Sequence, residues 1–304
     1  MRDFSAITLL GRFDKQKLWY TLRMNYFSAL ALIVVSIFLF IVINDILDFF
    51  DRKKLLKKLK NTPFDQNDRE VLKKIPHYRN LNDTDKEKIE RSILIFLHTK
   101  EFLGVRTLVT QEMKLVISFY ACLLLLHIDT DNCYDDLKTV VIYPHATVTE
   151  EIKSYGGIYT KARFMIEGQS ANNAVMICWH EAKSQAYHLR HNNVIIHEFT
   201  HEIDFMSGIL DGAPPIERSK YHQWTHTLLK EFKKLNNVAM KNRNWGKYKT
   251  LGAYAATNES EFFAVVTERF FESPNNLKQN FPELYEELKS FYKIDTAELL
   301  KKRS

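Results

Sequence analysis

The segment Val194-Ile195-Ile196-His197-Glu198-Phe199-Thr200-His201 joins an apolar run to two histidines and a glutamate at a fixed spacing. On a helix, residues four positions apart lie one turn apart on the same face. His197 and His201 can therefore reach one metal ion together, with Glu198 beside the ion's open coordination position. The spacing predicts a helix over 193–206 that carries a catalytic zinc site.

The residues around the motif decide between a surface helix and a buried one, because the motif alone also arises by chance. Burying two histidines and a glutamate without a ligand would be costly. A buried metal-binding helix that ends at the loop Ser207-Gly208 explains the sequence better than a surface helix does. The apolar residues that favour burial are Val194, Ile195, Phe199, Ile203 and Phe205.

A catalytic zinc needs a third protein ligand and keeps a fourth position for water. No further histidine follows His201 at short spacing, so we expect a carboxylate from later in the chain. Glu261 lies in the first turn of an apolar helix expected over 258–272. Asn258 and Glu261 also have the spacing of a capping box, in which the glutamate only returns to the backbone. Spacing alone supports both roles equally, and it leaves three rival ligands, Glu259, Glu268 and Glu272.

Several blocks of the sequence resemble the MtfA-like (Mlc titration factor A) zinc peptidases. They are HEFTHEID at 197–204, YAATNESEFFAVVTERFFE at 254–272 and FPELYEELKSFYKID at 281–295, with LVTQEMKLVISFYACLLLL at 108–126 and VVIYP at 140–144 upstream. The blocks occur in the same order and cover roughly residues 90 to 295. The resemblance implies that His197, His201 and Glu261 bind zinc. It also implies a fold related to the gluzincins, including the lethal-factor-like group.

Three further residues have expected roles beside the ion. Glu198 is the expected general base for an attacking water. The resemblance places Tyr254 near the zinc, where its hydroxyl would stabilise negative charge on the substrate oxygen, although a merely packed tyrosine is the alternative. Asp204 lies one turn beyond His201 and is expected to accept a ring N–H from a ligand histidine, unless it is an exposed acid near a helix end.

The order of the expected helices and strands predicts an α+β domain, mainly helical and gluzincin-like with a small β-sheet, and the length allows one such globular domain plus an appendage. With 304 residues, of which 45% are hydrophobic and 26% charged, the chain can bury a sizeable core. We expect a juxtamembrane segment over 1–25, a membrane helix over 26–50, a basic linker over 51–70 and a peptidase domain over 71–298. Other expected helices cover 85–100, 110–126, 219–237 and 282–292, and expected strands cover 139–143 and 174–179.

The run Tyr26–Ile43 has no charged residue over a length close to that of a bilayer, with Trp19 as a candidate interface residue. A cleaved signal peptide is the first alternative, but the run is long and Asn44-Asp45-Ile46 offers no small-residue cleavage site. A buried core helix is the second, and the apolar character of every face argues against it. We therefore expect a single transmembrane helix that anchors the chain, in the inner membrane of the cell.

Basic residues lie on both sides of that run, so the positive-inside rule does not decide the orientation. Cys122, Cys133 and Cys178 are widely spaced and form no CxxC pair, which favours a reducing compartment and a domain that faces the cytoplasm. The net charge of +6 owes much to a block that suits a membrane surface better than nucleic acid, because aromatic residues are not interleaved with it. That block consists of Arg52, Lys53, Lys54, Lys57, Lys58 and Lys60.

Two functions are compatible with these features. The first is a membrane-anchored zinc metallopeptidase that hydrolyses peptide or protein substrates. The second, which the name of the resembling family implies, is a regulatory protein that sequesters a transcription factor and uses its metal only for structure. The departures from simpler members of the family are the N-terminal extension and Glu202, and neither affects the expected ligands.

Overall fold

The computed structural model describes residues 30–301, apart from 45, 48, 52, 60, 61, 129–133, 146–172 and 191. It divides into two units, Met1–Thr62 and Pro63–Ser304. The expectations for residues 1–29, including Trp19 and the beginning of the apolar run at Tyr26, lie outside the described residues, and so does Cys133.

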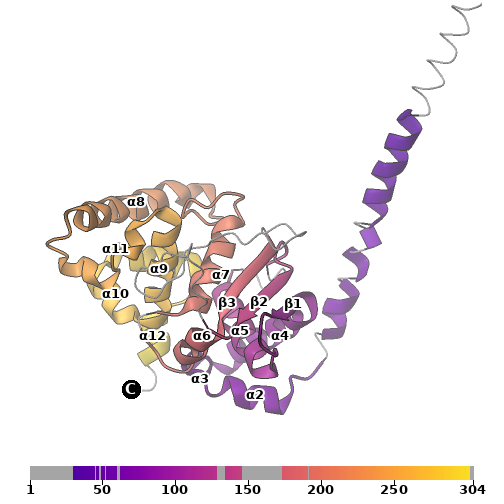
Figure 1. The fold of residues 1–304 in the computed structure, drawn as a ribbon, viewed down its shortest axis with the longest axis horizontal. Helices are drawn as coiled ribbons and strands as arrows, with labels where there is room; N and C mark the ends of the chain where they lie inside the picture. The colour runs from indigo at the N-terminus through magenta and orange to yellow at the C-terminus, as the bar shows by residue number, and fades with distance from the viewer. Residues whose placement is uncertain are drawn as a thin grey trace, which may run out of the picture. The chain divides into compact units, whose positions relative to one another are not determined.

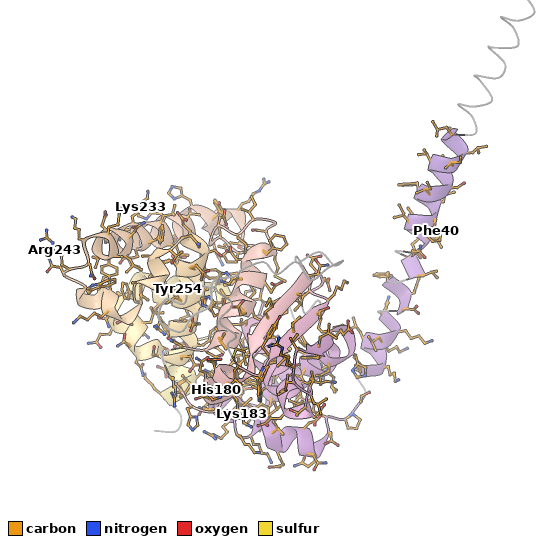
Figure 2. All side chains as sticks on the ribbon, viewed as in Figure 1. Phe40, His180, Lys183, Lys233, Arg243 and Tyr254 are labelled. Carbon is orange, nitrogen blue, oxygen red and sulfur yellow. The ribbon has the colours of Figure 1, made fainter. Side chains whose placement is uncertain are left out.

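The first unit contains a helix over Leu30–Leu59. None of the described residues of its apolar stretch is buried, and the exposed side chain of Phe40 is visible in Figure 2. At about 1.5 Å per residue, the 30 residues of this helix exceed the roughly 30 Å of a hydrocarbon core. Length and composition alone therefore make it a candidate membrane span. The helix continues into the basic block, so part of the expected linker is helical.

The second unit is mainly helical with a small sheet, which confirms the expected α+β class (Figure 1). The described elements before the metal helix are α2 (Gln66–Leu72), α3 (Pro76–Asn80), α4 (Asp83–Thr99), β1 (Glu101–Gly104), α5 (Gln111–Leu125), β2 (Thr139–Tyr143), β3 (Ala174–Cys178) and α6 (Trp179–Ala186). Those that follow are α7 (Val194–Phe205), α8 (Arg218–Lys241), η2 (Gly246–Thr250), η3 (Tyr254–Ala256), α9 (Glu259–Glu272), α10 (Pro274–Asn280), α11 (Pro282–Tyr292) and α12 (Thr296–Lys301).

The described strands form a parallel sheet in the order β1-β2-β3. Parallel neighbours need a crossover connection, and α5 provides it between β1 and β2. Strand β1 was not expected from the sequence, because it is four residues long and largely exposed. Strand β3 ends at Cys178, one residue before the expected end, because Trp179 already begins α6.

Helix α5 forms the centre of the core, since every residue from Met113 to Leu125 except Lys114 is buried. A helix that is apolar on all sides is stable only when other elements surround it. Helices α4 and α7 pack against α5, and α7 also contacts β3 and α9. Phe199 extends the α7 side of this packing, with its ring centroid 5.8 Å from that of Phe96 on α4. The core thus fixes one face of α7 and leaves the other facing α9.

Candidate metal centre

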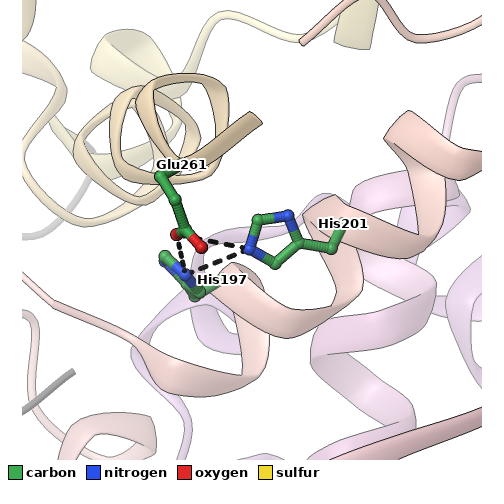
Figure 3. Close-up of side chains that lie close together, drawn as sticks. All are labelled: His197, His201 and Glu261. Carbon is green, nitrogen blue, oxygen red and sulfur yellow. Dashed lines mark hydrogen bonds and ion pairs between the residues drawn. The ribbon is translucent and has the colours of Figure 1, made fainter. Parts of the chain in front are cut away.

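Three side chains from two helices converge in the second unit (Figure 3). The Nε2 atoms of His197 and His201 on α7 are 3.3 Å apart. One carboxylate oxygen of Glu261 on α9 lies 3.0 Å from His197 Nε2 and 3.4 Å from His201 Nε2. All three side chains are buried, at 2%, 6% and 9% exposure respectively, so bulk water does not separate them.

Local sequence explains why α7 and α9 begin where they do. The Asn193 side chain accepts hydrogen bonds from the amides of Ile195 and Ile196 and thereby caps α7. Asn258 caps α9 by accepting from the amide of Glu261 at 2.8 Å. Only that half of the expected capping box is present, because the Glu261 carboxylate points to the two histidines and not back to the cap.

The other ring nitrogen of each histidine also has a partner. His197 Nδ1 lies 2.7 Å from Glu268 Oε1, and His201 Nδ1 lies 3.0 Å from the hydroxyl of Ser260. A carboxylate only accepts, so His197 carries a proton on Nδ1 and turns Nε2 toward the centre. From the sequence, Glu268 is only a rival ligand, and Ser260 does not stand out. Their positions on the α9 face that carries Glu261 were the available signal.

A buried polar network extends from Glu268 away from the centre. Glu268 Oε2 accepts from the amide of Asn193 at 2.8 Å, and the Asn193 side chain donates to Glu272 at 2.8 Å. The amide of Arg190 also donates to Glu272, at 3.0 Å. Burial raises the pKa of Glu272 to about 8, against these hydrogen bonds. Asn193 therefore links the cap of the metal helix to two carboxylates of α9.

The pKa shifts at the centre reflect the contact between the histidines and the carboxylates of α9. Burial opposes protonation of His197, but the carboxylates of Glu261 and Glu268 outweigh it and raise the pKa of His197 to about 10. Burial likewise opposes ionisation of Glu261, yet both histidines lower its pKa well below the usual range. Without a metal ion, a doubly protonated His197 would donate one hydrogen bond to Glu261 and one to Glu268.

The donor set fits a divalent cation. Two imidazole nitrogens and one carboxylate oxygen, all within 4.8 Å of one another, match the three-ligand sets of catalytic zinc sites. The Glu268 carboxylate on Nδ1 of His197 leaves the Nε2 lone pair of that ring for coordination, and Ser260 holds the ring of His201 through its Nδ1. Among the described residues, these three form the single cluster of this kind.

Glu198 and Tyr254 lie beside the three converging groups. Glu198 is 8% exposed, and its charge raises the pKa of both His197 and Tyr254. The Tyr254 hydroxyl is buried without a hydrogen-bond partner among the described residues. Burial and the nearby Glu261 carboxylate raise the pKa of Tyr254, which keeps the hydroxyl protonated as a donor. The centre thus adjoins an unpaired carboxylate and an unpaired hydroxyl.

Asp204 is fully buried, so it is not an exposed acid at a helix end. Its Oδ2 accepts from the amide of Gly212 at 3.0 Å. Burial raises its pKa, an effect that Ser260 and that amide partly offset. Ser260, and not Asp204, lies against the ring N–H of His201. The structure therefore gives Asp204 an indirect position, behind Ser260, in place of the expected contact with a ligand histidine.

The centre has the donor set of a metallopeptidase, and comparison with known sequences assigns the family. Residues 50–293 match the glucose-regulated metallo-peptidase M90 family, so the chain belongs to that family. Membership implies a metal, which agrees with the donor set.

Two kinds of relatives are similar to this chain. An uncharacterized protein of Synechocystis is 33% identical over 232 residues, which cover 73% of this chain and 81% of the relative. Mlc titration factor A of Serratia proteamaculans is 28% identical over 71% of this chain and 83% of its own length. The protein of the same name from Yersinia pestis is 27% identical over 75% of this chain and 84% of its own length. The resemblance seen in the sequence is thereby confirmed.

Proposed function

We propose that this protein is a zinc-dependent peptidase, with His197, His201 and Glu261 as the metal ligands. The observation that carries the proposal is the convergence of two imidazole nitrogens and one carboxylate oxygen beside a carboxylate with no partner. Zinc bound there would supply a Lewis acid that lowers the pKa of a water molecule and polarises a carbonyl. The rest of the chemistry falls to residues of the chain.

Glu198 is the proposed general base. Its carboxylate has no hydrogen-bond or ion-pair partner among the described residues, so it is available to accept a proton from the attacking water. The same carboxyl group would then deliver that proton to the leaving amine. Tyr254 would donate its hydroxyl hydrogen to the carbonyl oxygen as negative charge develops there, because that hydroxyl has no competing partner.

The test compares the full chain with Glu198→Gln, which keeps the size of the side chain but removes the base. We expect about one zinc per chain in both proteins, measured by elemental analysis, and a loss of peptide hydrolysis on the order of 100-fold or more in the variant. Glu286→Gln removes one exposed carboxylate from α11 and should hydrolyse as the parent does. Equal hydrolysis by parent and Glu198→Gln would refute the mechanism.

The proposed location is the inner membrane, with one span within Leu30–Leu59 and the second unit in the cytoplasm. The length and apolar composition of this helix support the span. The spacing of the three cysteines supports the cytoplasmic side, since it offers no paired framework for disulfides. The same anchor would place the peptidase unit near membrane-associated or newly made substrates.

A regulatory binding protein is the second candidate, because the relatives are named for titration of Mlc. In that case the chain would sequester a transcription factor and the metal would serve the structure. The two functions predict opposite results for Glu198→Gln in cells: the peptidase loses its phenotype, whereas a sequestering protein keeps it. Exposed substitutions that leave hydrolysis intact but abolish the phenotype would favour sequestration.

A further inference from the structure

Two histidines outside the metal centre lie side by side where strands β2 and β3 end. The rings of His145 and His180 have centroids 5.2 Å apart, with an angle of 47° between their planes. Both side chains are exposed, and His180 is labelled in Figure 2. Neither ring forms a hydrogen bond or an ion pair with a described residue, so the nitrogens of both are available to a ligand.

The pairing of the two strands explains why these rings meet. Parallel strands β2 and β3 place Tyr143 opposite Cys178, so the residues two positions later lie opposite each other on the same side. The amide of His180 donates to the carbonyl of Pro144 at 3.2 Å, which continues the connection between the two segments past the sheet. The sheet therefore brings His145 and His180 together, at the carboxyl ends of parallel strands, where α/β proteins commonly hold ligands.

The separation of the two rings suits a shared metal ion. A zinc–nitrogen bond is about 2.0–2.1 Å long, so two imidazoles on one tetrahedral ion have centroids roughly 5 Å apart. The rings of His197 and His201, in the proposed zinc centre, are 4.9 Å apart by the same measure. A small rotation of two exposed side chains would therefore let His145 and His180 coordinate one ion.

A second exposed pair, His222 and His226 on α8, is less suited to a shared ion. Its ring centroids are 6.4 Å apart, and the planes of the rings are stacked at an angle of 7°. The lone pair of an imidazole nitrogen lies in the plane of its ring, so stacked parallel rings direct their lone pairs side by side and not toward one ion. Arg218 also lies one turn from His222 on the same face, and its charge opposes a cation. This pair provides a matched control.

The charges around His145 and His180 permit a cation. Lys183, one turn along α6 from His180, is paired with Glu112 at 3.0 Å. The positive end of the α6 dipole opposes a cation only weakly at an exposed site, and Glu181 in the first turn offsets it. One carboxylate oxygen of Glu181 is buried without a hydrogen-bond partner among the described residues. Glu181 is not counted as a ligand, because its oxygens form no three-donor group with the two rings.

We propose that His145 and His180 form a second metal site, which binds a divalent transition-metal ion such as Cu²⁺ or Zn²⁺ with water in the remaining positions. Imidazole nitrogens suit these ions, and Cu²⁺ binds more strongly than Zn²⁺ to a given set of nitrogen donors. Two protein donors hold an ion more weakly than the three of the proposed centre, so this site fills after the centre does. The second site does not depend on peptide hydrolysis.

Copper binding to the zinc-loaded full chain tests this proposal. Cu²⁺ is added in steps up to one equivalent, an electron paramagnetic resonance spectrum is recorded at each step, and the zinc released is measured in the ultrafiltrate. We expect bound Cu²⁺ with hyperfine coupling to two imidazole nitrogens, while the zinc stays with the protein.

Two double variants identify the ligands. His145→Gln combined with His180→Gln should abolish the two-nitrogen spectrum, whereas His222→Gln combined with His226→Gln should keep it. Each single variant at 145 or 180 should leave coupling to one nitrogen and a weaker complex. All four side chains are exposed, so zinc content and circular dichroism should equal those of the parent in both double variants.

Several outcomes would overturn the second site. Zinc released in proportion to the copper added would place the copper in the proposed centre. A spectrum that survives His145→Gln with His180→Gln, or that disappears with His222→Gln and His226→Gln, would assign the copper to other residues. A parent chain that binds no copper would also refute the site. The peptidase is tested by hydrolysis and not by copper, so the two proposals fail separately.

Discussion

Glu268 fixes which ring nitrogen of His197 carries the proton and which one points toward Glu261 and His201. Its carboxylate accepts from His197 Nδ1 with one oxygen and from the amide of Asn193 with the other. Both contacts are buried, so neither water nor salt weakens them. Such a partner fixes the tautomer and the ring orientation of a metal ligand and raises its basicity.

Replacing Glu268 with glutamine should weaken zinc binding by 10- to 100-fold, as expected for a lost carboxylate partner of a ligand histidine. The single carbonyl oxygen of glutamine can accept well from only one of the two donors. Competition with a chromophoric chelator measures the affinity, and Glu286→Gln on the exposed face of α11 is the matched control. Equal affinities for parent and Glu268→Gln would show that the contact does not orient the ligand.

Tyr254→Phe should lower kcat on the order of 100-fold while zinc content and the free energy of unfolding stay close to those of the parent. The reason is that the hydroxyl makes no well-formed hydrogen bond within the described protein, and Glu261, the nearby carboxylate, keeps both histidines as partners when the hydroxyl is removed. Tyr143→Phe removes the same atom outside the centre and serves as control. A fall in zinc content with Tyr254→Phe would assign the tyrosine to metal retention and not to the reaction.

At the scale of elements, helix α9 combines the metal ligand and its support. It is buried from Ser260 to Glu272, and Glu261, Glu268 and Glu272 all face α7 or its cap. Burying three carboxylates side by side is unfavourable unless each has partners. Histidines, asparagine and backbone amides supply those partners, which ties the position of α9 to that of α7.

His77 connects three further helices at the far end of this network. Its Nε2 lies 3.0 Å from the carbonyl oxygen of Phe271 on α9, and its Nδ1 lies 3.3 Å from the hydroxyl of Tyr120 on α5. Burial lowers the pKa of His77 to about 4 in spite of the contact with Phe271, so the folded protein holds this histidine neutral. The stability of the contacts that His77 makes among α3, α5 and α9 should therefore depend on pH.

The contribution of His77 to stability should be complete above pH 6.5, its usual pKa, and should be lost as the pH falls toward 4. Below pH 6.5 the unfolded chain binds the proton and the folded chain does not, at a cost of up to roughly 3 kcal/mol. Glu272, with its raised pKa, has the opposite slope between its usual value and about pH 8. Glu272 Oε1 lies 4.0 Å from His77 Nε2, so the variant Glu272→Gln is compared as well, to separate the two contributions.

Urea unfolding of the metal-free chain between pH 7.5 and 4.5 measures this effect. We expect the parent to lose more stability than His77→Gln over this interval, because glutamine does not titrate and still donates to Phe271. His98→Gln, on the exposed face of α4, should follow the parent. Parallel curves for parent and His77→Gln would contradict the assigned protonation state.

The sequence predicted the long helices and the strands β2 and β3 well, but it did not predict several of the other short elements. Helix α11 begins and ends where its prolines and apolar spacing indicated, and α7 and α9 differ from expectation by a residue at their ends. Helix α10 was not expected, because Ser273-Pro274 ends α9, but proline also suits the first turn of the next helix. Strand β1 carries too few buried residues to produce a pattern.

At the scale of the whole molecule, the helix Leu30–Leu59 and residues Pro63–Ser304 belong to two separate compact units. Every residue of the proposed site belongs to the second unit. Removal of residues 1–62 should therefore move the chain from carbonate-washed membranes to the soluble fraction while zinc binding persists. Immunoblotting of the two fractions and elemental analysis of the purified truncation provide the measurements.

A subtler variant distinguishes insertion from surface attachment. Val34→Arg combined with Phe38→Arg places two charges within the apolar stretch, each at a cost of about 3 kcal/mol if that stretch lies in hydrocarbon. We expect this variant to leave the membrane fraction as the truncation does. A parent chain that is already soluble, or a truncation that stays with the membranes, would refute the anchor.

The sequence by itself determined the features that depend on neighbours along the chain. The spacing of His197 and His201 set two imidazoles on one face of a helix, and the apolar run before Asn44 set a helix long enough to span a bilayer. Which of the carboxylates on α9 meets the metal ligands directly was decided only by tertiary structure. Glu261 and Glu268 lie 64 and 71 positions from His197 in the sequence. Because α9 packs against α7, Glu261 reaches Nε2 of His197 and Glu268 reaches Nδ1. Helical spacing places both on the same face, but only the packing of the two helices fixes how far along that face each ring nitrogen lies.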